Sequence, residues 1–202
     1  MKYNKLLELN NNRSKILTSL NNKKVGEVKI TQLVTLLSEV RYSLECELVS
    51  SKGWKPECRE GQVCVLNNDQ IALLGGHNNY PISRLSYFNT KDSEWTKGGE
   101  SELKRTYHSS VTYRKSYVIL FGGMGTYNSH YKTRECLNSC ILYTTTSNSL
   151  RSIKISNEEI VEPRRQHSAC IIGKHMLVYG GINTKKEYLS DLKILNLKAL
   201  EW

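Results

Sequence analysis

Three diglycine pairs recur along the 202-residue chain, each directly after a short apolar run. The three runs with their pairs are Leu74-Gly75-Gly76, Phe121-Gly122-Gly123 and Tyr179-Gly180-Gly181. An arginine precedes each pair at a distance of sixteen or seventeen residues, and these arginines are Arg59, Arg105 and Arg164. Three residues after the arginines stand Gln62, His108 and His167. A repeat of about fifty residues constrains the fold more than any other feature of this sequence.

A window of fourteen residues follows each diglycine pair, and the three windows superpose without a gap. They span residues 82–95, 137–150 and 189–202. In this register Leu85, Cys140 and Leu192 coincide, as do Phe88, Tyr143 and Leu195, and the windows end at Trp95, Leu150 and Trp202. A period of this length, with a diglycine in mid-repeat and a terminal tryptophan, is typical of a propeller blade, a four-stranded antiparallel sheet.

These features resemble the kelch-repeat family over about residues 56–202. The motifs that carry the resemblance are Pro163-Arg164 with His167-Ser168, the three diglycines, Leu189-Ser190-Asp191-Leu192, and the terminal Trp95 and Trp202. The first copy has Gln62 in place of histidine, and the second has Leu150 in place of tryptophan. The resemblance implies an all-β fold: a partial kelch-type β-propeller of about three four-stranded antiparallel blades (about 56–95, 105–150 and 164–202), preceded by a short α-helical segment.

We expect the repeat motif to be structural, because a catalytic group has no reason to recur in successive copies. Glycine after a strand permits positive φ or close backbone approach, and a terminal tryptophan fills the seam between blades. The arginine, histidine and serine of each copy are expected to hydrogen-bond strands and loops at the repeat boundary. The structural set is Arg59, Gly75, Gly76, Trp95, Arg105, His108, Gly122, Gly123, Arg164, His167, Gly180, Gly181 and Trp202.

Residues 1–50 have a different, helical period. Leu6, Leu9, Ile16 and Leu20 form one apolar row, and Ile30, Leu33, Leu37, Val40 and Leu44 form a second. The segment 21–26 between them holds turn formers and a glycine, which predicts a helical hairpin or a bent helix. An alternative register makes residues 41–54 the remnant of an earlier blade, with Trp54 at the terminal position, but Glu47 at an apolar position favours the helix.

Three blades do not close a ring, since propellers typically have four to eight. An open fan exposes an apolar blade face and unpaired strand edges. The sequence leaves three solutions open: the chain is a fragment of a longer propeller, another chain supplies blades, or residues 1–50 cover the outer faces. We expect self-association or poor solubility of the isolated chain.

Variation in length between the copies falls on one face. The connections that differ are those between the second and third strands and those between the fourth strand and the next copy, which emerge on the same side of an antiparallel meander. Loop tips on a rigid scaffold commonly carry binding residues, and tyrosine and arginine often anchor interfaces. The candidate partner-binding residues are His77, Asn78, Tyr80, Arg84, Tyr127, His130, Tyr131, Arg134, Lys185 and Tyr188.

Composition narrows the function classes. The formal net charge is +10, yet no cluster of basic residues interleaved with aromatic residues marks a nucleic-acid interface. No apolar run reaches the length of a bilayer span, and the N-terminus has charges where a signal peptide has its apolar stretch. Six scattered cysteines are expected to be thiols that behave as small buried hydrophobes, and the step from Cys136 to Cys140 is a poor zinc signature.

The sequence therefore predicts a protein-interaction scaffold or adaptor in the cytoplasm that binds a partner protein, with no catalytic residue, no cofactor and no metal. The chief alternative is a kelch-type enzyme acting on a small molecule, because fold does not fix function. Five histidines, two of them used by the repeat motif, leave little for a metal site. Weak nucleic-acid binding through the basic surface is the remaining alternative.

Overall fold

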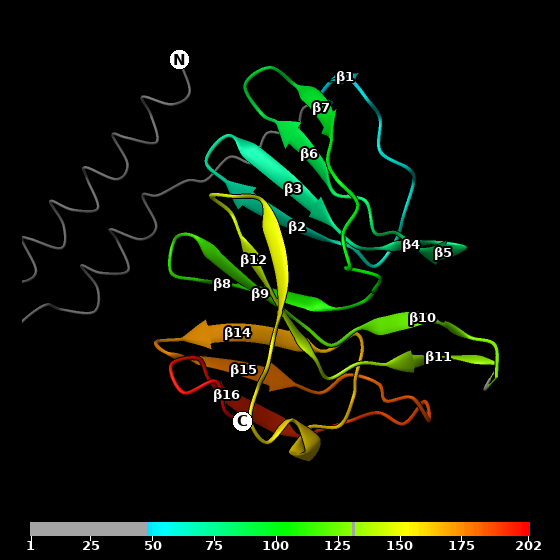
Figure 1. Ribbon diagram of the computed structural model, residues 1–202, viewed down its shortest axis with the longest axis vertical. Coiled ribbons are helices and arrows are strands. Elements are labelled where there is room, and N and C mark those ends of the chain that lie inside the picture. The colour runs from blue at the N-terminus through cyan, green and yellow to red at the C-terminus, as the bar shows by residue number, and fades with distance from the viewer. Residues whose placement is uncertain (1–47, 131) are drawn as a thin grey trace, which may run out of the picture. The chain divides into compact units, whose positions relative to one another are not determined.

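Three β-sheets follow one another along the chain and stack face on face (Figure 1). The computed structural model describes residues 48–130 and 132–202, and the helices expected before residue 48 lie outside the described residues. Residues 48–50 carry no regular structure. We number the sheets as blades 1, 2 and 3 in chain order.

Blade 1 has five strands in the order β1-β7-β6-β3-β2. Its strands are β1 (Lys52–Gly53), β2 (Val63–Asn67), β3 (Gln70–Leu74), β6 (Ser86–Asn89) and β7 (Glu94–Lys97). Strands β2, β3, β6 and β7 form the predicted antiparallel meander. Strand β1 pairs parallel to β7, which adds a strand to the expected four.

Blade 2 is the predicted four-stranded meander, in the order β13-β12-β9-β8. Its strands are β8 (Ser109–Tyr113), β9 (Tyr117–Phe121), β12 (Cys140–Thr144) and β13 (Ser149–Ile153). Two short hairpins lie between second and third strands: β4 (His77–Asn78) with β5 (Tyr80–Pro81) in blade 1, and β10 (Met124–Asn128) with β11 (Thr133–Cys136) in blade 2.

Blade 3 has three strands in place of the expected four. They are β14 (Ser168–Ile172), β15 (His175–Tyr179) and β16 (Leu192–Asn196), with the 3-10 turn η1 (Glu158–Ile160) ahead of them. At the fourth position Glu201 makes only isolated bridges, antiparallel to Asn196 and parallel to Ser156. The parallel bridge from Ser156 matches the pairing of β1 with β7 in blade 1.

The strand registers confirm the equivalence of the three windows. Leu73 pairs with Ser86, Leu120 with Ile141 and Val178 with Lys193, so the third strands of all three blades align as the sequence predicts. Ser93, Asn148 and Leu200 each have positive φ and each precede the final two residues of a window. Trp95 and Trp202 therefore occupy corresponding places. Trp54 does not, because its amide donates to the carbonyl of Trp95 from the neighbouring strand, while residues 41–47 of the alternative blade register lie outside the described residues.

Two apolar clusters fill the seams between blades. We call the face of a blade that meets the following blade its trailing face, and the opposite one its leading face. In the first seam the trailing face of blade 1 (Val65, Ala72, Leu74, Leu85) packs on the leading face of blade 2 (Val118, Leu120, Ile141, Tyr143). In the second, Val111, Ile119, Phe121 and Cys140 of blade 2 pack on Met176, Val178 and Leu195 of blade 3.

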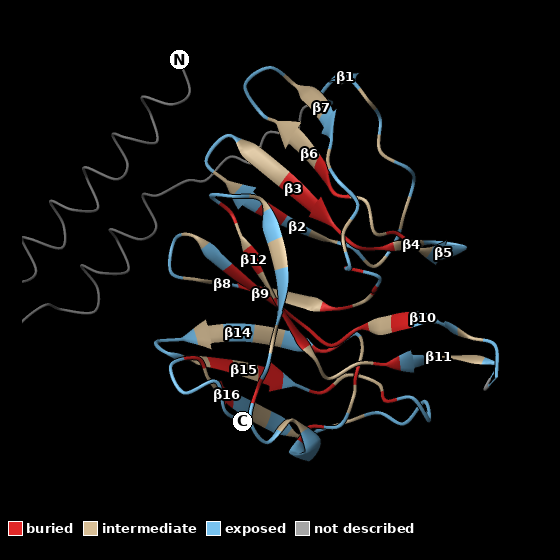
Figure 2. Ribbon diagram, viewed as in Figure 1, coloured by how far each residue is buried: buried red, intermediate tan, exposed pale blue. Residues whose placement is uncertain are grey.

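The seams hold the fold together because they remove large apolar side chains from water. Phe121, Leu74 and Leu195 are fully buried, and each such side chain contributes about 1.5–3 kcal/mol. Figure 2 shows buried segments in β3, β9 and β15, the second strands of the three blades. Trp202 packs against the second seam with its ring 5.0 Å from that of Phe121. The expectation that the cysteines are buried is correct for Cys136 and Cys140 and wrong for Cys58, Cys64 and Cys170, which are exposed thiols.

Candidate functional site

The second-to-third-strand connections of all three blades extend from the same side of the sheets (Figure 1). They are the β4–β5 hairpin, the β10–β11 hairpin and the loop of residues 180–191 between β15 and β16. We call this side the loop face. Each connection has an exposed tyrosine among its described residues: Tyr80 is 58% exposed, Tyr127 56% and Tyr188 86%.

The first connection is held by acidic residues close to the start of the repeat. The hydroxyl of Tyr80 donates to Glu57 at 3.2 Å, which raises the pKa of this tyrosine, and the backbone of His77 pairs with that of Glu60. Arg84 makes an ion pair with Glu100 and donates to the carbonyl of Gly98. Of the four predicted residues in this connection, Asn78 and Tyr80 are exposed on the hairpin, His77 is half-buried, and Arg84 is engaged with the connection to blade 2.

The second connection reaches across to the first. In the β10–β11 hairpin Tyr127 faces Arg134 across the strand pair, and the Arg134 guanidinium donates to the carbonyl of Asn79 at 2.7 Å. This bond joins the hairpins of blades 1 and 2. His130 is exposed at the hairpin turn, where its amide donates to Asn128. Tyr131, the remaining predicted residue of this connection, lies outside the described residues.

The third connection is organised around a buried amide. Asn183 is 2% exposed, and its side-chain nitrogen donates to Glu162 at 2.5 Å and to Glu187 at 2.7 Å. Its side-chain oxygen accepts the amide of Glu187. This turn leaves Lys185 and Tyr188 exposed, as predicted.

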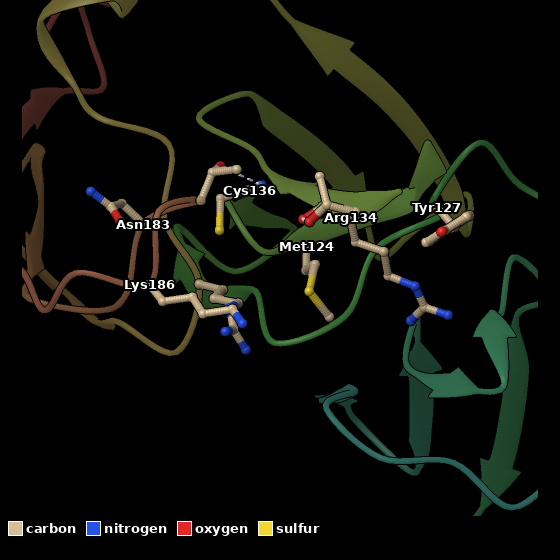
Figure 3. A pocket seen from close by; sticks show the side chains of 9 residues that line it. Met124, Tyr127, Arg134, Cys136, Asn183 and Lys186 are labelled. Carbon is tan, nitrogen blue, oxygen red and sulfur yellow. Dashed lines mark hydrogen bonds between the residues drawn. The ribbon is translucent and has the colours of Figure 1, made fainter. Parts of the chain in front are cut away.

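A cavity of about 250 Å3 lies between the second and third connections (Figure 3). Its cationic side chains come from two blades, with Arg134 from β11 and Arg165 and Lys186 from the chain of blade 3. The other lining residues are Met124, Tyr127, Thr133, Cys136, Asn183 and Thr184. The amide of Cys136 donates to the Thr184 hydroxyl at 3.0 Å, which ties the two connections together at the cavity. Burial raises the pKa of the Cys136 thiol, so this sulfur stays protonated.

Sequence reasoning missed Arg165. It directly follows the repeat arginine Arg164, and its backbone bridges to Ile182 of the third connection. The matching residues Glu60 and Thr106 make the same bridge to the first and second connections. The residue after each repeat arginine therefore borders the loop face in all three blades, and it differs between them (Glu, Thr, Arg). This variation at a fixed place in the repeat is the sequence signal that indicates Arg165 as a candidate binding residue.

The repeat arginines lie four residues before the first strand of each blade and bind the diglycine turns. Arg59, Arg105 and Arg164 each donate to the carbonyl of the first glycine of their own pair, at 3.0, 2.9 and 3.1 Å. The amide of the second glycine, Gly76 or Gly123, donates to the carbonyl of the arginine in the following blade. The motif therefore closes the seam between consecutive blades.

The repeat histidines are buried in the same seams. Burial lowers the pKa of His108 to about 3 and that of His167 to about 4, and the nearby repeat arginine acts in the same direction. Both rings are therefore neutral near pH 7. His167 Nε2 lies 2.8 Å from the hydroxyl of Ser109, and its ring packs edge-on against Phe121.

Within residues 48–130 and 132–202, no group of three or more His, Cys, Asp or Glu side chains is arranged to hold a metal ion. No helix in those residues is long and apolar enough to cross a membrane.

The sequence matches the family model of the KLHDC2/KLHL20/DRC7 Kelch-repeats domain over residues 83–202. It is also 24% identical to the mouse protein "Kelch domain-containing protein 1" (Mus musculus), in an alignment that covers 76% of this chain and 45% of the mouse protein. The chain thus spans less than half the length of this relative. Kelch-repeat domains generally mediate protein–protein interaction. The three repeats, their registers and the family match together show that this chain belongs to the kelch-repeat family.

Proposed function

We propose that this chain is a cytoplasmic protein-interaction scaffold that binds a partner protein through its loop face. The observation that carries the proposal is an exposed tyrosine on the loop-face connection of each blade, together with a cavity between the second and third connections that Tyr127 and three cationic residues line. Tyrosine and arginine are the residue types that most often anchor interfaces. The bond from Arg134 to Asn79 and that from Cys136 to Thr184 join neighbouring connections, so the anchors are presented by a linked surface.

The charges at the cavity favour an acidic segment of the partner. Arg134, Arg165 and Lys186 line it, while the two nearby carboxylates, Glu162 and Glu187, already accept hydrogen bonds from Asn183. An incoming carboxylate would gain charge-assisted hydrogen bonds from guanidinium groups. Association steered by this charge weakens as salt rises.

We propose no catalytic function. The cavity of about 250 Å3 is smaller than the roughly 300–1,000 Å3 typical of small-molecule sites. The serine and histidine that approach each other, Ser109 and His167, belong to neighbouring blades and serve their seam. No contact among residues 48–130 and 132–202 specifically favours nucleic acid, and nuclease treatment in the experiment below tests for it.

The test is photo-crosslinking from single positions on the full chain in cell lysate. A photoreactive phenylalanine analogue replaces Tyr127 or Tyr188 on the loop face, and the control replaces Tyr117 at the start of β9, in the turn at the opposite end of the strands. We expect discrete, nuclease-resistant protein adducts from the two loop positions, at least about tenfold above the control. Equal yields from all three positions, or adducts removed by nuclease, contradict the proposal.

Charge reversal tests the acidic partner. In the chain with the analogue at Tyr188, the double variant Arg134→Glu with Lys186→Glu should abolish the adduct. The matched control reverses Lys115 and Lys174, which are exposed in the strand turns away from the loop face, and should leave the adduct unchanged. An adduct that survives the loop-face reversal shows that the cavity charges do not select the partner.

A further inference from the structure

Blade 3 carries an apolar trailing face that nothing among the described residues covers. Four of its side chains are half or more exposed: Ile172 by 62%, Tyr179 by 56%, Leu192 by 54% and Ile194 by 50%. Cys170 is an exposed thiol on the same face, and Leu177 lies between them on β15. Exposed apolar surface that is contiguous, in contrast to scattered residues, marks an interaction site.

The strand registers show which residues of blade 2 hold the same places. Ser168 pairs with Tyr179 as Ser109 pairs with Phe121, so the positions of blades 2 and 3 correspond residue by residue. The equivalents of the blade 3 face are Val111, Tyr113, Ile119, Phe121, Cys140 and Leu142. In blade 2 all six belong to or pack against the seam with blade 3. The trailing face of blade 3 therefore has the composition of a seam that lacks its second half.

The leading face of blade 1 supplies the complementary half. The leading face of blade 3 packs on blade 2 with Ala169, Ile171, Met176, Leu195 and Trp202. The corresponding residues of blade 1 are Cys64, Leu66, Ile71, Phe88 and Trp95. Leu66 is 70% exposed and Cys64 is exposed, although their equivalents Ile171 and Ala169 are packed.

We infer that the trailing face of blade 3 docks on the leading face of blade 1 of a second copy of this chain, so that two copies close into a ring of six blades. The contact repeats the two seams already present, with apolar residues at the same positions on both sides. A head-to-tail contact closes into a ring when its rotation divides a full turn, so closure by two copies of three blades requires each blade to be rotated by one sixth of a turn from the one before it. Six blades lie within the usual four to eight.

The first measurement is the mass of the 202-residue chain by sedimentation equilibrium between roughly 1 and 100 µM, the range in which dimers of micromolar affinity dissociate. We expect a reversible step from 23.2 kDa to twice that mass. A monomer throughout this range overturns the inference, as does a series of ever larger species, because an open contact forms chains in place of a closed pair.

Two substitutions test the two faces separately. Ile194→Lys places a charge on the trailing face of blade 3, and Leu66→Glu places one on the leading face of blade 1. Each should weaken dimerisation at least about 30-fold, the effect of losing one central interface residue. Ile160→Lys is the matched control, since Ile160 is 52% exposed in η1 and outside both faces. Circular dichroism of each variant checks that the sheets remain folded.

Mixing the two variants distinguishes head-to-tail contact from symmetric contact. Each variant keeps one intact face, so an equimolar mixture should form a heterodimer through one unaltered seam. If two blade 3 faces met each other, Leu66→Glu would dimerise like the wild type and the mixture would gain nothing, and this result overturns the inference.

Cysteine labelling supplies a measurement on the unaltered chain. Cys64 and Cys170 lie on the two docking faces, whereas Cys58 is exposed ahead of the repeat arginine Arg59. At dimer-forming concentration a bulky maleimide should modify Cys64 and Cys170 at least about tenfold more slowly than Cys58, and dilution should remove the difference. Equal rates for the three thiols at high concentration refute the docked arrangement, even if a variant has failed to fold.

Discussion

Blades 3 and 1 hold the same repeat arginine in different ways. Arg164 in blade 3 is fully buried, and its two terminal nitrogens bind both carboxylate oxygens of Asp191 at 2.6 and 2.9 Å. Arg59 in blade 1 keeps the bond to its glycine carbonyl, but its Nη2 has no hydrogen-bond partner among the described residues. All three repeat arginines share the bond to the glycine carbonyl. A second position in each blade decides whether the guanidinium charge also has a carboxylate partner.

That second position immediately precedes the aligned residues Leu85, Cys140 and Leu192. It is Asp191 in blade 3, Ser139 in blade 2 and Arg84 in blade 1. The serine accepts a hydrogen bond from Arg105 at 3.1 Å, and Arg84 instead pairs with Glu100. Arg164 lowers the pKa of Asp191, whereas burial lowers the pKa of Arg105 to about 10 because that arginine has only neutral partners.

The largest expected effect comes from removing the two arginines. Arg164→Met leaves Asp191 and the Gly180 carbonyl without their donor, and should lower the free energy of unfolding by about 4 kcal/mol. Arg59→Met removes a guanidinium that is already incompletely bonded, and should cost about 1 kcal/mol. Urea denaturation of both variants measures the difference. Equal losses would show that the carboxylate adds nothing to the glycine bond.

The first glycines of blades 2 and 3 allow a comparison, because Gly122 lies in the seam with blade 3 whereas Gly180 lies on a blade that no following blade covers among the described residues. A methyl group added at Gly122 would lie 2.6 Å from the Arg164 carbonyl oxygen and 2.8 Å from the His167 ring, at a φ of +64°. At Gly180 the φ is +66° and the nearest atom is the Leu189 carbonyl oxygen at 3.2 Å. Gly122→Ala should therefore cost about 3 kcal/mol and Gly180→Ala about 1 kcal/mol, mainly backbone strain. Thermal unfolding of the pair decides, and a reversed order would contradict the seam geometry.

The buried histidines should make stability depend on pH. In the unfolded chain a histidine takes up a proton near pH 6.5, whereas burial keeps His167 neutral down to about pH 4. The unfolded state then binds more protons across this window, so the free energy of unfolding falls as pH falls from 6.5 to 4. His167→Gln should remove roughly 2 kcal/mol of the decrease between pH 7.5 and 5. The measurement is urea denaturation at a series of pH values, and parallel curves for variant and wild type would exclude His167 as a source.

The all-β fold and the alignment of the blades were predictable from the sequence, because one periodic pattern recurs at the diglycines and at Trp95 and Trp202. The side on which the connections emerge followed from strand alternation alone. In blade 3 the fourth strand is reduced to a bridge between Glu201 and Asn196, the same pairing that Glu94 makes with Asn89 in blade 1, because only residues 201 and 202 of this sequence correspond to β7.

The candidate site was predictable only in part. Tyr80, Tyr127, Lys185 and Tyr188 are exposed on the loop face as expected, while Arg84 turns to Glu100, an acid about sixteen residues away that no motif indicates. Asn183 and Arg165 act through contacts between segments distant in the sequence, which a repeat pattern does not encode. Exposure of Cys170 depends on whether a further blade covers it, which composition cannot show.

The smallest expected effect comes from giving blade 1 the acid of blade 3. Arg84→Asp places a carboxylate at the position of Asp191, where it can accept from the free Nη2 of Arg59, but it also removes the exposed ion pair with Glu100. Since exposed pairs contribute little and a charge-assisted bond to a half-buried guanidinium contributes more, we expect a net gain of about 0.5–1 kcal/mol. Arg84→Ala is the control, because it loses Glu100 without gaining the new bond and should be neutral or slightly destabilising. If both variants unfold at the same urea concentration, Arg59 does not bind the added carboxylate. The residue at the second position then affects the free energy of unfolding only where the arginine is completely buried, as in blade 3.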